Sequence, residues 1–181
     1  MKIILIRHGM TEGNLKRRYI GTTDEDLINT DCLKGDYPKC ERVVVSPLKR
    51  CIQTAEFIYP NVDIEICDKL KECDFGDFEN KSYEDLKDNP DYQKWIDSNG
   101  ELPFPNGETH EDFKNRCKDG FFESLTERDT AFVIHGGSIM AIMQKLFGGN
   151  FYDYQVKNGC GYEFEMRNGE IVDDYSPIGC S

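Results

Sequence analysis

Two short apolar runs in this chain each lead into a histidine. Residues 3–6 are followed by Arg7, His8 and a glycine, and residues 131–134 are followed by His135 and two glycines. The chain contains only three histidines in 181 residues. A neutral imidazole can attack phosphorus, and a guanidinium can bind two phosphate oxygens at once. The pattern therefore predicts a phosphate site, with phosphoryl transfer to or from a histidine.

Both runs are predicted to be buried strands that bring the histidines together. In an open α/β sheet, ligands bind just beyond the carboxyl ends of the strands. Further strands are expected at residues 42–46 and 62–66. Helices are expected at residues 11–18, 47–58, 82–87, 91–97, 109–125 and 138–147. Strands that alternate with helices predict a mostly parallel sheet, with His8 and His135 facing one pocket.

Local signals mark several element ends. Ser46 is a favourable N-cap and Pro47 suits a first helical turn, so a helix is predicted to begin there. Asn168-Gly169 predicts the tight turn of a C-terminal β-hairpin between strands at residues 161–166 and 170–175. Residues 27–42 are interrupted by glycine and proline, so any helix there is short. We expect that side of the sheet to be less covered, and to be filled by a neighbouring loop or a dimer contact.

The composition limits the possible partners. The formal net charge is −12, and an acidic chain is a poor partner for nucleic acid or anionic lipid. A phosphate site must therefore be a local basic pocket. None of the eight cysteines has Cys-x-x-Cys or zinc-like spacing, which predicts reduced thiols and no metal. Without a recognisable secretory signal or membrane-spanning run, the protein is expected to be cytoplasmic.

Five blocks of the sequence resemble the histidine phosphatase superfamily, also called phosphoglycerate mutase-like. The first is Arg7-His8-Gly9, with Thr11 and Asn14 after it. The others follow in the family's order: residues 46–55 with a second arginine, 70–76 with an acid, 105–116 with Pro-Asn-Gly-Glu, and 133–137 with the second histidine. The resemblance implies a single domain over residues 1–181. Its fold would be a three-layer α/β/α sandwich with a mostly parallel central sheet and a small helical cap at about residues 77–107.

The resemblance also implies a mechanism. His8 would attack phosphorus and form a phosphohistidine, which requires its other ring nitrogen to be held as a donor, typically by a backbone carbonyl. Glu72 would donate a proton to the leaving oxygen and later act as the base for water, with its pKa raised. Arg7, Arg50 and His135 would bind the phosphoryl oxygens, where transition-state charge collects. The remaining expected contacts are Asn14, Gly9 and Gly136 with phosphate, and Gly21 and Glu108 with substrate.

Several of these residues have a plainer interpretation. Arg50 alone would be read as a solvated helix cation, and Glu72 as an ordinary surface carboxylate. Glu108 could equally be a helix-start acid that complements the helix dipole. We expect His110 at the surface, and Trp95 in the core of the cap rather than against substrate.

The predicted function is that of a metal-independent phosphomonoesterase acting on a small phosphorylated metabolite. The compact length and the forms of the Glu72 and Gly107-Glu108 blocks look most like the α-ribazole phosphatase and broad-specificity phosphatase branch, so α-ribazole-5'-phosphate is one candidate substrate. Two alternatives remain: a cofactor-dependent phosphoglycerate mutase, disfavoured by Ile20 where mutases carry a small hydroxyl residue, and a non-catalytic phosphate-binding module. We expect no cofactor, nucleic acid or membrane partner, and a monomer or homodimer.

Overall fold

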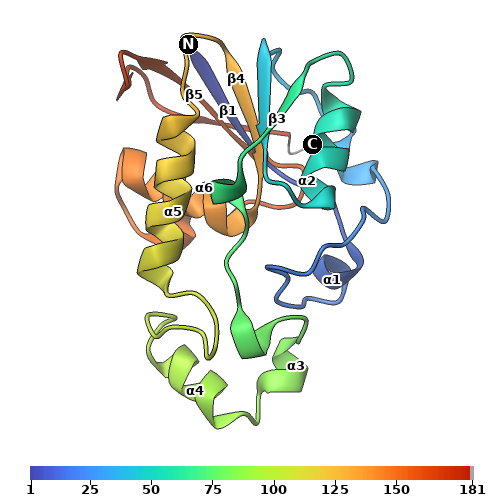
Figure 1. The fold of residues 1–181 in the computed structure, drawn as a ribbon, viewed down its shortest axis with the longest axis vertical. Helices are drawn as coiled ribbons and strands as arrows, with labels where there is room; N and C mark the ends of the chain where they lie inside the picture. The colour runs from blue at the N-terminus through green and yellow to red at the C-terminus, as the bar shows by residue number, and fades with distance from the viewer. Residues whose placement is uncertain (180–181) are drawn as a thin grey trace.

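The computed structural model describes residues 1–179, and a seven-stranded sheet forms its centre (Figure 1). The strand order is β3-β2-β4-β1-β5-β6, and β7 pairs with β5. The strands are β1 (Lys2–Arg7), β2 (Arg42–Val45), β3 (Ile64–Ile66), β4 (Thr130–Ile134), β5 (Gly161–Arg167), β6 (Glu170–Ile171) and β7 (Ser176–Ile178). Strands β3, β2, β4 and β1 are parallel to one another, and β5 is antiparallel to β1. Strand β5 is also antiparallel to β6 and β7, so the sheet is mixed, with the expected parallel pairing in its β3-β2-β4-β1 part.

Strands β1 and β4 are central neighbours and carry the two histidines. They are parallel, in a register that pairs Arg7 with Ile134. The backbone N–H of His8 continues the ladder by donating to the carbonyl of Ile134 at 2.9 Å. Because parallel strands end at the same edge of the sheet, His8 and His135 leave it side by side.

Helices cover both faces of the sheet and form three layers. The helices are α1 (Glu12–Leu15), α2 (Lys49–Ile58), α3 (Tyr83–Leu86), α4 (Pro90–Asp97), α5 (His110–Glu123) and α6 (Gly136–Phe147), with short 3₁₀ helices η1 (Asp31–Leu33), η2 (Asp68–Leu70), η3 (Gly76–Phe78) and η4 (Phe151–Tyr154). Alternate residues of a strand point to opposite faces. Accordingly, Ile3 and Leu5 of β1 pack with α5 and α6, while Ile4 and Ile6 pack with α2. The α/β/α sandwich is thus built by the period of the strands.

Residues 77–107, here called the cap, extend past the strand ends that carry the histidines (Figure 1). Ser82 caps α3 by accepting from the backbone N–H of Asp85, and Asn89 caps α4, which begins with Pro90. These caps satisfy helix donors that a short helix would otherwise leave open. Aromatic rings fill the cap's interior: Phe78, Tyr92 and Phe104 are buried, and Trp95 packs against all three.

Two expected element boundaries are wrong. Helix α2 begins at Lys49, because Leu48 is extended and the Ser46 hydroxyl is hydrogen-bonded to His135 at 2.7 Å rather than capping a helix. The Asn168-Gly169 turn is present, with φ of 53° and 80°, as a two-residue hairpin turn requires. However, β6 extends only over residues 170–171. The following strand β7 was not expected.

The thinly covered side of the sheet is filled by nearby chain. Tyr37, Cys40 and Ile178 of β7 pack into the apolar cluster beneath α2. The Tyr37 hydroxyl donates to the carbonyl of Gly159 at 2.7 Å, which fixes the loop against the body. A neighbouring loop therefore supplies the cover, one of the two expected solutions.

The remaining sequence expectations concern cysteines and membranes. Six cysteines are free thiols, namely Cys32, Cys40, Cys51, Cys67, Cys73 and Cys117. Cys160 is disulfide-bonded, so the expectation of reduced thiols is wrong there, and Cys180 lies outside the described residues. Within residues 1–179, no helix has the length and apolar character needed to cross a membrane.

Candidate active site

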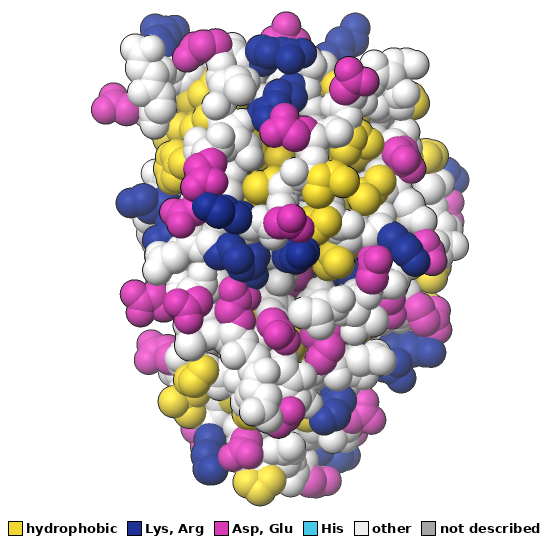
Figure 2. Space-filling model, in the orientation of Figure 1, with side chains coloured by type: hydrophobic (Ala, Val, Ile, Leu, Met, Phe, Trp, Pro, Cys, Tyr) yellow, Lys and Arg dark blue, Asp and Glu magenta, His cyan; other side chains and the backbone are white. Residues whose placement is uncertain are grey.

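A cavity of about 390 Å³ lies at the carboxyl ends of β1 and β4, between the sheet and the cap. Five of the expected site residues line it: Arg7, His8, Asn14, Glu72 and Gly136. The face of the molecule in Figure 2 carries acidic and basic side chains intermixed, with many carboxylates. Around His8, by contrast, the two guanidinium groups of Arg7 and Arg50 are close enough to depress its pKa. The cavity thus provides the local basic environment that an acidic chain needs to bind phosphate.

His8 is held as a neutral imidazole with one nitrogen free. Its side chain is 3% exposed, and its Nδ1 lies 2.7 Å from the carbonyl oxygen of Gly9. Because a carbonyl can only accept, Nδ1 carries the proton and Nε2 keeps its lone pair. Burial, followed by the charges of Arg50 and Arg7, holds the pKa of His8 well below its usual value. The ring therefore has the protonation state of a nucleophile.

Arg7 lies beside His8 with part of its hydrogen-bonding capacity unused. Its Nη1 donates to the carbonyl of Val156 at 2.7 Å, while its buried Nε has no partner among the described residues. Gly136 lies next to this guanidinium, where a Cβ would be in ordinary contact with Nε at 3.4 Å. An unpaired buried donor is costly unless something binds it. An anion in the cavity would supply the missing acceptor.

Arg50 and His135 lie behind His8 and do not line the cavity. Both are 0% exposed. Arg50 Nε donates to His135 Nδ1 at 3.4 Å, so Nε2 of His135 carries the proton and donates to the Ser46 hydroxyl at 2.7 Å. The rings of His8 and His135 are 5.2 Å apart. Burial and the charge of Arg50 lower the pKa of His135 well below its usual value, so this second imidazole is also neutral.

The backbone around His8 is fixed by two side chains far away in sequence. The N–H of Gly9 donates to the hydroxyl of Thr54 at 2.8 Å. The amide of Asn158 donates to the carbonyls of His8 and Gly9 and to the side-chain oxygen of Asn14, at 3.0, 3.1 and 3.0 Å. With its oxygen bonded in this way, Asn14 can direct its NH₂ group, which has no partner among residues 1–179, into the cavity. Asn158 was not expected in the site, and no nearby motif singles it out.

Glu72 enters the cavity from the segment after η2 and meets the start of α6. Its two carboxyl oxygens accept from the backbone N–H groups of Cys73, at 3.0 Å, and Gly137, at 3.1 Å. Burial raises the pKa of Glu72, against the lowering effect of these hydrogen bonds and of Arg50 and Arg7. The raised pKa favours the protonated acid. Such a shift is in the direction that suits a general acid.

Comparison with known proteins agrees with this arrangement. The family model for the histidine phosphatase superfamily (branch 1) matches residues 3–173. The chain belongs to the histidine phosphatase superfamily. The uncharacterized phosphatase PhoE of Bacillus subtilis is 32% identical over 94% of this chain and 92% of its own. The adenosylcobalamin/alpha-ribazole phosphatase of Salmonella typhimurium is 25% identical over 93% of this chain and 92% of its own.

Solved structures of histidine phosphatases have the same fold. The alpha-ribazole phosphatase of Shigella flexneri superposes with a TM-score of 0.79 and 25% identity, over 94% of this chain and 93% of its own. A putative alpha-ribazole-5'-P phosphatase from Escherichia coli reaches a TM-score of 0.84 over 100% and 96% of the two chains, at 22% identity. The family, its phosphatase relatives and the fold together identify this protein as a phosphatase, a hydrolase of phosphate esters.

Two expected substrate contacts lie elsewhere in this histidine phosphatase. Gly21 and Glu108 line a neighbouring depression instead of the cavity with His8. The carboxylate of Glu108 forms a bidentate ion pair with Arg116, at 2.9 and 2.7 Å. Arg116 also donates to the carbonyls of Lys69, Lys71 and Glu72. Glu108 therefore helps to hold the segment that carries Glu72, and it does not reach the cavity.

Much of the cavity lining is aromatic, and one expectation about it is wrong. His110 lines the cavity and packs edge-to-face on Phe151 at 4.9 Å, whereas a surface position was expected. Trp95 is part of the cap's aromatic core, as expected, and it also lines the cavity, with a buried Nε1 that has no partner among residues 1–179. Other rings in this wall are Tyr19, Phe75, Phe104, Phe113, Phe151 and Tyr152.

Among residues 1–179, no three His, Cys, Asp or Glu side chains are grouped so that they could hold a metal ion.

Proposed function

We propose that this phosphatase hydrolyses a phosphomonoester of a small metabolite in two steps through His8. In the first step, the lone pair on Nε2 of His8 attacks phosphorus and the bond to the leaving oxygen breaks. In the second, water attacks the phosphohistidine, and inorganic phosphate and free His8 are released. The observation that carries this proposal is the 2.7 Å contact from Nδ1 of His8 to the Gly9 carbonyl, which leaves Nε2 unprotonated.

The phosphoryl oxygens are expected to be bound by groups around His8. Arg7 has an unpaired Nε at the cavity, and Asn14 has a free amide NH₂. The N-terminus of α6 adds positive potential at Gly136. Arg50 and His135 supply a second layer of polarised donors behind His8. Fixed donors and cations at the equatorial oxygens are the main source of catalysis in phosphoryl transfer.

Glu72 is proposed as the proton donor to the leaving oxygen in the first step. Its raised pKa, caused by burial, favours the protonated form that this role requires. After donation, the carboxylate formed is held by the N–H groups of Cys73 and Gly137. It then takes the proton of the attacking water in the second step, which returns the acid to its starting state.

The lining of the cavity favours a phosphomonoester whose alcohol portion is apolar and planar. Much of that lining is aromatic, and Arg18 is the one Lys or Arg besides Arg7 among the described lining residues. Such a wall favours a ring over a second phosphate, which a bisphosphate-dependent mutase must bind. α-Ribazole-5'-phosphate, which carries an aromatic base, is therefore the substrate we would test first. Two of the similar proteins carry the name alpha-ribazole phosphatase.

The test is phosphate release from a panel of monoesters in the presence of a metal chelator. The panel contains α-ribazole-5'-phosphate, phosphoserine and 3-phosphoglycerate, and His8→Ala serves as the inactive control. We expect metal-independent release, fastest from the aromatic ester. Isomerisation of 3-phosphoglycerate, with bisphosphoglycerate supplied and without net release, would replace this proposal with a mutase. Silence in both assays would favour a phosphate-binding module.

A further inference from the structure

The buried Arg50 is aimed by a loop, and the loop is held by the cap. The guanidinium of Arg50 has no exposed surface. Its Nη1 donates to the carbonyl of Thr23 at 2.7 Å, and its Nη2 donates to the carbonyls of Gly21 and Ile20 at 2.9 and 3.4 Å. Because Nε donates to His135, the position of the guanidinium depends on the directions of the carbonyl groups of residues 20–23.

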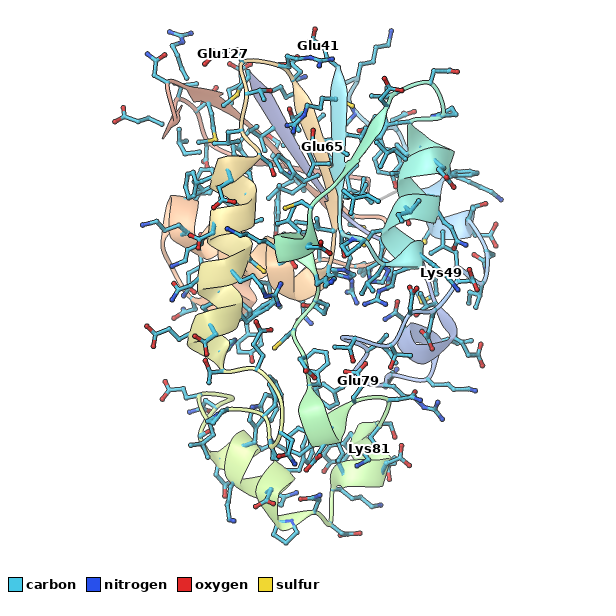
Figure 3. All side chains as sticks on the ribbon, viewed as in Figure 1. Glu41, Lys49, Glu65, Glu79, Lys81 and Glu127 are labelled. Atoms are coloured by element: carbon cyan, nitrogen blue, oxygen red, sulfur yellow. The ribbon has the colours of Figure 1, made fainter. Side chains whose placement is uncertain are left out.

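A single carboxylate from the cap holds that loop from the other side. Oε1 of Glu79 accepts from the backbone N–H groups of Gly21 and Thr23, both at 2.9 Å, and from the Thr23 hydroxyl at 2.8 Å. Figure 3 shows Glu79 at the top of the cap, where it meets the chain after α1. Oε2 of Glu79 is buried and has no partner among residues 1–179. The side chain is thus committed to the loop.

The loop of residues 20–23 is also restrained by close packing and by backbone hydrogen bonds. A Cβ at Gly21 would lie 1.9 Å from the carbonyl oxygen of Cys73, so the loop packs directly on the segment that follows Glu72. Tyr19, just before the loop, exchanges backbone hydrogen bonds with Asn80 and Lys81 of the cap. Glu79 therefore acts in a narrow gap between the cap, the segment carrying the acid and the buried arginine.

We propose that Glu79 is a positioning residue for Arg50, acting through the carbonyls of Gly21 and Thr23. The inference rests on the proposed role of Arg50 in stabilising the transferring phosphoryl group. A carboxylate that accepts three hydrogen bonds from Gly21 and Thr23 fixes the orientation of the peptide groups in this loop. The two Nη atoms of Arg50 bond the carbonyls of the same loop, so the orientation of the loop sets the position of the guanidinium. Because displacements of about 1 Å can cost about 100-fold in rate, a loosened loop slows chemistry without removing any group from the cavity.

The first test compares carboxylates of the cap. Glu79→Ala should lower kcat about 10- to 100-fold with KM changed less than about threefold, because the stabilisation that a misplaced Arg50 loses is one made mainly in the transition state. Glu79→Gln keeps an acceptor oxygen and should recover most of the loss. Glu84→Ala and Glu84→Gln are the matched controls, since Glu84 is an exposed carboxylate of α3 that pairs with Lys87. Both should stay within about twofold of the parent, and near-parental kcat for Glu79→Ala would overturn the proposal.

The second test asks whether Glu79 acts through Arg50. Glu79→Ala is combined with Arg50→Met, which keeps the apolar stem, and thermal unfolding confirms that each variant is folded. The double variant should be no more than about twofold slower than Arg50→Met alone, because the same effect cannot be lost twice. Losses that multiply would overturn the positioning role. If Arg50→Met itself turns over at the parental rate, it is the proposed role of Arg50 that fails, whatever Glu79→Ala does.

Should Arg50→Met not fold, Arg50→Lys supplies the background. A lysine retains the charge but cannot bond the carbonyls of Gly21 and Thr23 in the same fork. Glu79→Ala should then add little to its loss of kcat, and a multiplied loss would again contradict the proposal.

Discussion

Gly137→Ala should lower the catalytic rate by displacing the carboxyl group of Glu72, although the substitution removes no titratable side chain. A Cβ at residue 137 would lie 2.3 Å from Oε1 of Glu72 and 3.0 Å from Cζ of Phe113. An ordinary carbon–oxygen contact is about 1 Å longer than the first distance, so Glu72 must move by about 1 Å, and a displacement of that size costs about 100-fold. In free energy this is roughly 2.7 kcal/mol of transition-state stabilisation.

The leaving group provides the sharpest readout for this variant. An alkyl monoester needs a proton on its departing oxygen, whereas 4-nitrophenyl phosphate hardly does. Phosphate release should therefore fall about 100-fold for the alkyl ester and less than about tenfold for the nitrophenyl ester. Gly136→Ala is the matched control on the same helical turn, since its Cβ would lie 3.4 Å from Arg7 Nε in ordinary contact. It should lose far less.

Equal losses on the two esters in Gly137→Ala would refute the assignment of Glu72 as the proton donor. So would parental rates on both, provided that the variant is folded. The helix itself should not suffer, because alanine is favoured over glycine within a helix by about 1 kcal/mol. Thermal unfolding of both variants checks this point.

Three further outcomes follow from the same geometry. Arg50→Lys should lower kcat about 100-fold and change KM much less, because an ammonium group cannot bond all the acceptors that the planar guanidinium bonds. An unchanged kcat in steady-state assays would show that Arg50 does not stabilise the transition state. The profile of kcat/KM against pH should be bell-shaped, because His8 stays neutral down to below its ordinary pKa and Glu72 stays protonated to above its own. Glu72→Gln should remove the basic limb, and a limb that persists would belong to another group. Asn158→Ala should raise the inhibition constant of inorganic phosphate and lower kcat about tenfold, because Asn14 is no longer held in place. Product-inhibition assays would measure the first effect, and unchanged inhibition would contradict the role of Asn158.

The residues that could be predicted from the sequence are those whose signal is local. The apolar runs ending at His8 and His135 specify buried strands, and parallel pairing then brings the two rings to 5.2 Å. Thr109 was expected to open a helix and does so, by accepting from the N–H of Asp112. The hairpin turn at residues 168–169 is likewise a two-residue signal. In each case a short stretch of chain contains the whole physical cause.

The features that could not be predicted depend on partners far away in sequence. Serine is a favoured N-cap residue, yet the hydroxyl of Ser46 is hydrogen-bonded to His135, 89 residues away. Asn158 acts on the loop after His8 across 150 residues. Glu108 looked available for substrate until its carboxylate was found paired with Arg116. Glu79 has no motif of its own, because its role exists only once the cap is folded over the loop of residues 20–23.

The central claim is that Nε2 of His8 carries the phosphoryl group between the two steps. The most direct measurement is to mix enzyme with a monoester whose phosphate is radiolabelled, quench in base within a single turnover, and map the label by peptide mass analysis. A base-stable, acid-labile phosphoryl group on the peptide containing His8, absent from His8→Ala, is the predicted result. Label on a different residue, or a His8→Ala variant that still releases phosphate at the parental rate, would contradict it.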